Sequence, residues 1–225
     1  MSQLSRERLV EINSEAMQGE KRSDQRLRRL MPLIHLDTSM NVIDIGCGDG
    51  KLLGYMYDKV GQYTGIDFSQ RWIDQAKLRA DRLGANNVTL QVGDIVEFSQ
   101  SNLDRYDSAF TMDFSEHVYD DAFINIYRAI RKILKPGGKL YLHTPNGDYF
   151  LELLKKFGIL KPSEGHIGIR NAAQHQVLLS RSGFQKIEIR YYPHYIPLLA
   201  SIHALPFVPF VGKYFRARLF IICAA

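Results

Sequence analysis

The residues with the clearest chemical potential form a glycine-rich turn directly after a short apolar run, Val42-Ile-Asp-Ile-Gly-Cys-Gly-Asp-Gly50. Glycines let the backbone turn sharply and approach a ligand closely, where a Cβ atom would obstruct it. The spacing differs from the G-x-G-x-x-G dinucleotide fingerprint, because Lys51 stands where the third glycine would be, and no Gly-Lys-Ser/Thr ending of a phosphate-binding loop follows. The turn therefore favours a ligand without a pyrophosphate.

Acidic residues end the next two apolar runs. Asp67 lies about twenty residues after the turn, where a carboxylate can accept both hydroxyl groups of a ribose. Asp94 ends the following run, in Val92-Gly-Asp-Ile95. Ordinary turn chemistry is the alternative explanation, because Asp and Gly favour turns in any fold. Three such features in order, each at the end of a predicted strand, favour a nucleoside site.

Together these segments resemble the class I S-adenosylmethionine-dependent methyltransferases, whose first motif reads much like Asp44–Gly50. The resemblance continues through Leu134-Lys-Pro-Gly-Gly-Lys-Leu140 and covers residues 41–146, and more loosely the rest. It implies that S-adenosyl-L-methionine is the cofactor, that Asp67 binds the ribose, that Phe68 borders the adenine and that Asp94 accepts from the adenine amino group. The implied cofactor-binding residues are Asp44, Gly46, Cys47, Gly48, Asp67, Phe68, Asp94, Ile95 and Met112.

The acceptor side has a candidate cluster after the fourth predicted strand, Asp113-Phe-Ser-Glu116-His117, with His166 further along the chain. Two carboxylates and two imidazoles can bind Mg²⁺ or another divalent cation, which would orient acceptor oxygens and lower the pKa of a hydroxyl. The pattern resembles the E-x-x-E-H of ubiquinone-pathway O-methyltransferases and of small-RNA 2′-O-methyltransferases, with Asp113 in place of the first Glu.

A site without a metal is the alternative for this cluster. Glu116 and His117 then only shape the acceptor pocket, and His117 or His166 serves as the general base, because imidazole takes a proton near neutral pH. The candidate catalytic residues are His117, His166 and Glu116. Each histidine has a purely structural alternative as a helix cap or core residue.

The elements that must position these residues alternate between strands and helices, which predicts a doubly wound, Rossmann-like sheet with its ligand crevice at the carboxyl ends of the strands. Helices are expected after Gly50, Ser69, Asp120 and Ile169, with Ser69 as an N-cap and 135–138 as a helix stop. Seven mostly parallel strands are expected, at 41–45, 63–67, 88–92, 108–112, 139–143, 186–191 and 218–223.

Length predicts a single α/β domain over residues 1–225. It comprises an N-terminal helical cap (1–40), the Rossmann-like core (41–191 and 215–225) and an apolar insertion (192–214). The insertion is rich in proline and aromatic residues and is expected to form a lid or acceptor pocket, with peripheral membrane contact as the alternative.

Charge and cysteine content restrict the kinds of partner and the cellular compartment that we expect. Two cysteines give no disulfide framework, and residues 1–20 lack the apolar core of a secretory signal, so a cytoplasmic location is expected. The net charge of +5 is modest, which argues against nucleic acid. Basic residues concentrate near the N-terminus, and we interpret them as a solvated helix face rather than as a contact with nucleic acid or an anionic membrane. They are Arg6, Arg8, Lys21, Arg22, Arg26, Arg28 and Arg29.

The sequence thus predicts methyl transfer to an oxygen of a small, apolar or lipid-like metabolite. Two alternatives stay open: an N- or C-methyltransferase without a metal, and a non-catalytic scaffold subunit that binds the cofactor. The oligomeric state has no signal in the sequence.

Overall fold

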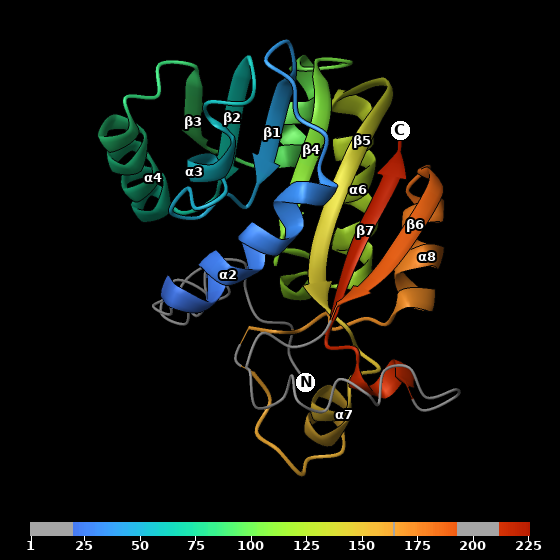
Figure 1. Cartoon of the computed structure of the whole chain (residues 1–225). Coiled ribbons are helices and arrows are strands. Elements are labelled where there is room, and N and C mark those ends of the chain that lie inside the picture. The colour runs from blue at the N-terminus through green and yellow to red at the C-terminus, as the bar shows by residue number, and fades with distance from the viewer. Residues whose placement is uncertain (1–19, 164, 193–211) are drawn as a thin grey trace.

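The computed structural model describes residues 20–163, 165–192 and 212–225, with the side chains of residues 20–24 left out. Within these residues, seven strands form one sheet in the order β3-β2-β1-β4-β5-β7-β6 (Figure 1). The strands are β1 (Asn41–Ile45), β2 (Gln62–Asp67), β3 (Val88–Val92), β4 (Tyr106–Met112), β5 (Leu134–Pro145), β6 (Gln185–Tyr192) and β7 (Arg218–Ala224).

Strand direction follows the prediction of a mostly parallel sheet, with one exception. β1 to β5 pair in parallel. β7 runs antiparallel to both of its neighbours, β5 and β6, so a β6–β7 hairpin completes the sheet. Antiparallel neighbours, unlike parallel ones, need no crossover helix between them.

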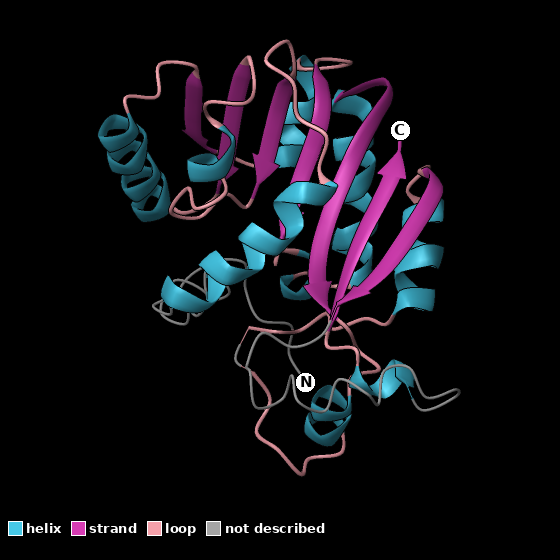
Figure 2. Cartoon of the chain, viewed as in Figure 1, coloured by secondary structure: helices cyan, strands magenta, loops and turns pink. Residues whose placement is uncertain are grey.

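Helices cover both faces of the sheet (Figure 2), as expected for a doubly wound α/β fold. They are α2 (Glu20–Leu30), α3 (Leu53–Met56), α4 (Gln70–Leu83), α5 (Ile95–Phe98), α6 (Asp120–Ile133), α7 (Phe150–Lys156) and α8 (Ala172–Arg181). Short 3₁₀ turns are η1 (Met31–Leu33), η2 (Ser99–Ser101), η3 (Ser115–His117) and η5 (Gly212–Phe215).

The central strands are buried on both faces because their residues are apolar at odd and even positions alike. Ile43 of β1 packs in a cluster with Phe123 and Leu179, on the face covered by α6 and α8. Its neighbour Val42 points the other way and packs with Leu27 of α2 and other residues of that face. Burial on both faces is typical of parallel strands that helices cover on either side.

Helix starts and stops agree with the sequence signals. Ser69 is the N-cap of α4, where its Oγ accepts from the N–H of Trp72 at 3.4 Å. α6 ends at Ile133, directly before the predicted stop at 135–138. β5 begins at Leu134, earlier than predicted, because Leu134 pairs with Tyr106 across an irregularity in the β4–β5 register. Residues 1–19 and most of the apolar insertion (193–211) lie outside the described residues.

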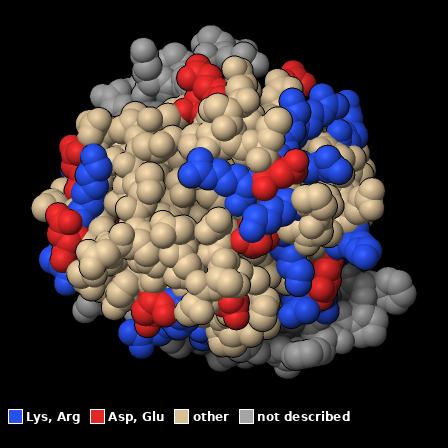
Figure 3. All heavy atoms as spheres, turned by 90° about the horizontal axis from the view of Figure 1, so that it is seen from above, with Lys and Arg blue, Asp and Glu red and all other residues tan. Residues whose placement is uncertain are grey.

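The carboxyl ends of β1 to β5 meet at one edge of the sheet, at the bottom of Figure 1, and α2 lies in front of the sheet close to that edge. The opposite end, seen in Figure 3, carries Lys and Arg side chains interspersed with Asp and Glu. No helix in the described part of the chain has the length and apolar character needed to cross a bilayer.

Candidate functional site

The glycine-rich turn lies at the carboxyl end of β1 and is tied to the end of β2. The backbone N–H groups of Gly46 and Cys47 both donate to the carbonyl oxygen of Ile66, at 2.8 and 3.1 Å. The glycines at 46, 48 and 50 have φ angles of 71°, 52° and 74°, a region that other residues rarely adopt. A Cβ atom on Gly46 would also lie 2.6 Å from Cδ2 of Phe114. The turn therefore forms a narrow cradle that only glycine permits.

Asp67 lies beside this cradle at the end of β2. Its Oδ2 accepts from the N–H of Gly48 at 3.0 Å, and its Oδ1 accepts from the N–H of Ser69 at 2.9 Å. Burial raises the pKa of this carboxyl, and the backbone N–H bonds oppose that rise. Each carboxylate oxygen has a further lone pair, so Asp67 can also accept from the two hydroxyls of a ribose.

The end of β3 adjoins the same place, because the N–H of Gly93 donates to the carbonyl oxygen of Asp67 at 3.0 Å. Asp94 follows and caps α5, with its Oδ1 accepting from the N–H of Val96 at 2.7 Å. Ile95 is buried, whereas Phe68 and Met112 are partly buried at the ends of their strands. The fold thus gathers the predicted cofactor-binding residues at the ends of β1, β2, β3 and β4.

Two members of that set support the turn from the interior. Asp44 is 2% exposed and accepts from the hydroxyl of Tyr63 at 2.7 Å. Burial raises the pKa of Asp44 to about 7, although the bond from Tyr63 lowers it. Burial likewise raises the pKa of the Cys47 thiol. Both side chains are buried, so they support the turn from within the fold.

Three of the four predicted metal ligands come together at the end of β4. Glu116 and His117 lie on η3, His166 lies in the segment before α8, and one ligand atom from each is within 4.8 Å of the others. The two imidazole rings meet edge to face, with centroids 5.1 Å apart. Glu116 is 1% exposed, and its Oε2 accepts from Oγ1 of Thr144 at 3.1 Å.

Both histidines offer nitrogen atoms to this group. Nδ1 of His117 donates to the carbonyl oxygen of Gly165 at 3.0 Å, so the neutral ring keeps its lone pair on Nε2. Nδ1 of His166 is buried and has no hydrogen-bond partner among the described residues. Burial, together with the nearby His117 and Lys155, lowers the pKa of His166 to about 3, so its ring is neutral at neutral pH. An unpartnered buried nitrogen beside a carboxylate fits a divalent cation.

Asp113 lies apart from this group, contrary to its predicted role as a metal ligand. Its Oδ1 accepts from Nδ1 of His143 at 2.7 Å and from Nη1 of Arg218 at 3.3 Å, while its Oδ2 forms an ion pair with Arg26 of α2. Burial and the two arginines lower the pKa of His143, so the neutral ring donates its N–H. Asp113 thus joins α2 and β7 through ion pairs and β5 through a hydrogen bond.

Sequence reasoning missed the residues that hold the converging group in place. Thr144 lies at the carboxyl end of β5, as Asp67 lies at that of β2, so the rule that polar residues at strand ends form sites would have found it. Ser115 donates to Oγ1 of Thr144 at 3.0 Å and extends this buried chain. Arg170 belongs to no motif, and its role is visible only in its contacts.

The strand order, the glycine cradle after β1 and the carboxylate after β2 define a Rossmann-like, nucleoside-binding class of enzyme. Residues 36–177 match the family described as methyltransferase domain. The chain belongs to this family, within the class I S-adenosylmethionine-dependent methyltransferases.

Individual relatives refine the comparison. The ubiquinone biosynthesis O-methyltransferase of Acinetobacter baylyi is 30% identical over 148 residues, which are 58% of this chain and 61% of that protein. The chain therefore spans less than two thirds of this relative's length. A SAM dependent methyltransferase from Archaeoglobus fulgidus has a TM-score of 0.69 at 18% identity, over 90% of this chain and 93% of that one.

A second solved structure, phosphoethanolamine N-methyltransferase 2 of Haemonchus contortus in complex with S-adenosyl-L-methionine, has a TM-score of 0.69 at 20% identity. It covers 89% of this chain and 52% of that one. At these identities, the two structural likenesses show the shared fold.

Proposed function

We propose that this protein transfers a methyl group from S-adenosylmethionine to an oxygen atom of a small, apolar acceptor. The observation that carries the proposal is the convergence of Glu116, His117 and His166 at the end of β4, next to the glycine cradle. Phe114, two residues before Glu116, contacts the cradle at Gly46 and so links the two halves of the site. The similarity to ubiquinone biosynthesis O-methyltransferases supports oxygen as the receiving atom.

On the donor side, the protein has to bind S-adenosylmethionine and orient it. When bound, S-adenosylmethionine supplies a methyl group that its sulfonium already activates. The cradle and Asp67 would hold the amino-acid and ribose parts, so that the acceptor meets the methyl group in line and away from water. Little further covalent chemistry is required of the protein.

On the acceptor side, a divalent cation is the part of the proposal that explains most of the geometry. Bound by Glu116, His117 and His166, it would supply positive charge that lowers the pKa of an acceptor hydroxyl. A pKa of about 3 makes His166 a weak proton acceptor but leaves its nitrogens available as ligands. Two imidazoles with one carboxylate suit Mn²⁺ or Zn²⁺ better than Mg²⁺, because Mg²⁺ prefers oxygen ligands. Without a cation, His117 is the remaining base.

The apolar character of the acceptor has support from the surface at this end of the sheet. Phe157, Ile159 and Leu160 follow α7 and are 74%, 67% and 40% exposed. α7 lies beyond the carboxyl ends of the strands, on the side of the site (Figure 1). A metabolite with an apolar tail would contact such side chains favourably. Membrane contact through 192–214 stays a prediction, since most of that segment lies outside the described residues.

The acceptor can be found with methyl-labelled S-adenosylmethionine and a cell extract, followed by mass spectrometry of the labelled product. We expect label in a methoxy group of a small apolar compound. Label on nitrogen, on carbon or in RNA would contradict the proposed acceptor. Absence of transfer to any component would support a non-catalytic scaffold instead.

The cation is tested by removing it and by changing one ligand. Treatment with EDTA should abolish transfer and added Mg²⁺ or Mn²⁺ should restore it, while His166→Gln should demand a higher cation concentration. His35→Gln, at an exposed histidine of the same chain, is the matched control and should behave as the wild type. If methyl transfer is insensitive to chelation, the reaction uses no cation, and His117 is the proposed general base.

A further inference from the structure

Arg170 is a buried arginine that neither the motif resemblance nor the proposed chemistry uses. Only 3% of its surface is exposed, and it lies between His166 and the first turn of α8. A guanidinium in the interior is strongly unfavourable unless its charge is paired and its donors are satisfied. The groups that satisfy it therefore indicate its role.

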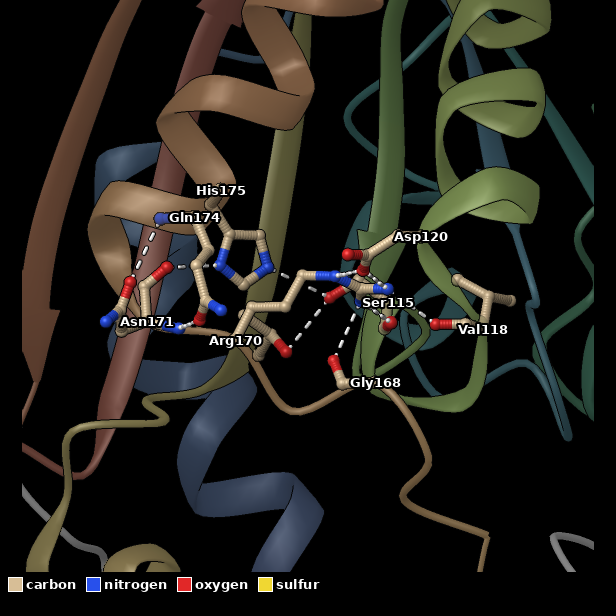
Figure 4. Close-up of polar contacts among 9 residues, drawn as sticks. Ser115, Val118, Asp120, Gly168, Arg170, Asn171, Gln174 and His175 are labelled. Carbon is tan, nitrogen blue, oxygen red and sulfur yellow. Dashed lines mark hydrogen bonds and ion pairs between the residues drawn. The ribbon is translucent and has the colours of Figure 1, made fainter. Parts of the chain in front are cut away.

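Its donors reach two separate segments of the chain (Figure 4). Nη1 donates to the carbonyl oxygens of Ser115 and Gly168, at 2.8 and 2.7 Å. Nη2 donates to the carbonyl oxygen of Val118 at 2.7 Å. Nε donates to Oδ1 of Asp120 at 2.7 Å, and this carboxylate balances the charge.

These acceptors flank the proposed site on both sides. Ser115 directly precedes Glu116, Val118 directly follows His117, and Gly168 lies two residues after His166. The N–H of Gly168 also donates to the carbonyl oxygen of Glu116 at 2.9 Å. The guanidinium thus fixes the η3 turn and the 165–168 segment against each other at the point where the three ligand side chains emerge.

The chain leaves room for this arginine through a glycine. A Cβ atom on Gly168 would lie 2.1 Å from the carbonyl oxygen of Val118 and 2.7 and 2.9 Å from Nη1 and Nη2 of Arg170. Alanine at 168 would therefore displace the guanidinium or the η3 turn. The backbone of Arg170 is anchored as well, since its carbonyl oxygen accepts from the N–H of Gly147 at 2.9 Å.

Lysine could not reproduce these contacts. The guanidinium is planar and directs its N–H groups in a fixed fork, so it serves Ser115, Gly168, Val118 and Asp120 at once. An ammonium group is compact, and its three donors cannot span acceptors on two segments. The guanidinium carbon also lies 4.8 Å from the ring centroid of Phe123, where its flat face is accommodated.

We infer that Arg170 is the positioning residue of the acceptor site: it holds Glu116 and His117 at the correct separation from His166. The inference rests on the proposed function of these three residues. The side-chain contacts of Arg170 given above do not include the glycine cradle, so its loss should leave cofactor binding intact and impair only the acceptor half.

The test compares Arg170→Lys and Gly168→Ala with Arg131→Lys, using the full chain. Arg131 is a matched control, because its Nε also donates to a backbone carbonyl oxygen, that of Gly183 at 2.8 Å, at an exposed position away from the site. Thermal unfolding, calorimetric affinity for S-adenosylhomocysteine and affinity for Mn²⁺ alone by electron paramagnetic resonance are measured for every variant. Hydrogen exchange of the Gly168 amide is measured for the two arginine variants and the wild type.

Both site variants should fold and bind S-adenosylhomocysteine within about twofold of the wild type, since the donor cradle is untouched. Mn²⁺ affinity and labelled methyl transfer in a cell extract should each fall about 10- to 100-fold. The Gly168 amide should exchange faster in Arg170→Lys, and Arg131→Lys should match the wild type in every measurement.

The inference would be overturned if Arg170→Lys bound Mn²⁺ as tightly as the wild type and its Gly168 amide exchanged at the wild-type rate. Equal weakening of S-adenosylhomocysteine and Mn²⁺ binding would also overturn it, because Arg170 would then support the whole fold. If the wild type itself binds no Mn²⁺, the proposed cation fails, and the Gly168 exchange rate in Arg170→Lys still decides whether Arg170 positions the two segments.

Discussion

Asp44 should make the stability of this protein depend on pH in an unusual direction, and Asp44→Asn should remove that dependence. The carboxyl is 2% exposed and accepts from the hydroxyl of Tyr63 at 2.7 Å. Burial raises its pKa from 3.8 to about 7 in the folded chain. Between these two values the folded protein binds a proton that the unfolded chain does not.

The direction and the size of the pH effect on the free energy of unfolding follow from this difference in pKa. Stability should fall as pH rises from 3.8 to about 7 and then level off, because above both values the native state carries the full cost of a buried carboxylate. That cost is roughly 4 kcal/mol at pH 8 and roughly 2 kcal/mol at pH 5, at about 1.4 kcal/mol for each pKa unit. Asparagine cannot ionise, so the variant gains more at pH 8 than at pH 5.

Urea unfolding of wild type and Asp44→Asn at pH 5 and pH 8 measures this gain. Taken from the unrounded costs, the difference in free energy of unfolding between the two proteins should be about 3 kcal/mol more favourable to the variant at pH 8 than at pH 5. Any constant effect of the new amide cancels between the two pH values. Asp58→Asn, at a side chain that is 56% exposed, is the control and should show no such change. A difference that is independent of pH, or larger at pH 5, would refute the reasoning.

Two further variants test local geometry. Gly46→Ala should weaken S-adenosylhomocysteine binding at least tenfold by calorimetry, because its Cβ would lie 2.6 Å from Phe114 at a φ of 71°; unchanged affinity would contradict the cradle. Asn171→Ala should lower the free energy of unfolding in urea by about 1 kcal/mol, since it removes the capping box at the start of α8. Equal stability would show that this cap contributes nothing.

Most of the fold was predictable because it depends on local signals. Strands 41–45 and 88–92 have the predicted bounds, because each is a short run rich in Val, Ile, Leu or Thr between turn residues. The antiparallel direction of β7 depends on which strands become neighbours, and no single run of residues encodes that. The sequence does not predict the start of β5, because Lys135-Pro-Gly-Gly138 signals a helix stop. In the structure, β5 includes these four residues, next to an irregularity in the β4–β5 register.

The residues of the site that stand at strand ends were predictable in the same way. Gly46 and Gly48 follow β1 and Asp67 ends β2, and the strand ends of a parallel sheet meet at one edge. The partners of Asp113 were not predictable, because Arg26 and Arg218 lie far from it in the sequence and approach only in the folded chain. Arg170 shows the same limit, since its acceptors are backbone carbonyl groups, which leave no mark on residue type.

The most direct test of the account is calorimetric titration of the wild type and Asp67→Ala with S-adenosylhomocysteine. We expect one binding site per chain in the wild type and an affinity about 100-fold lower in Asp67→Ala, which loses the carboxylate beside Gly48. Asp58→Ala, an exposed control, should bind as the wild type does. No binding by the wild type, or equal affinity of Asp67→Ala, would contradict the placement of the methyl donor in this cradle.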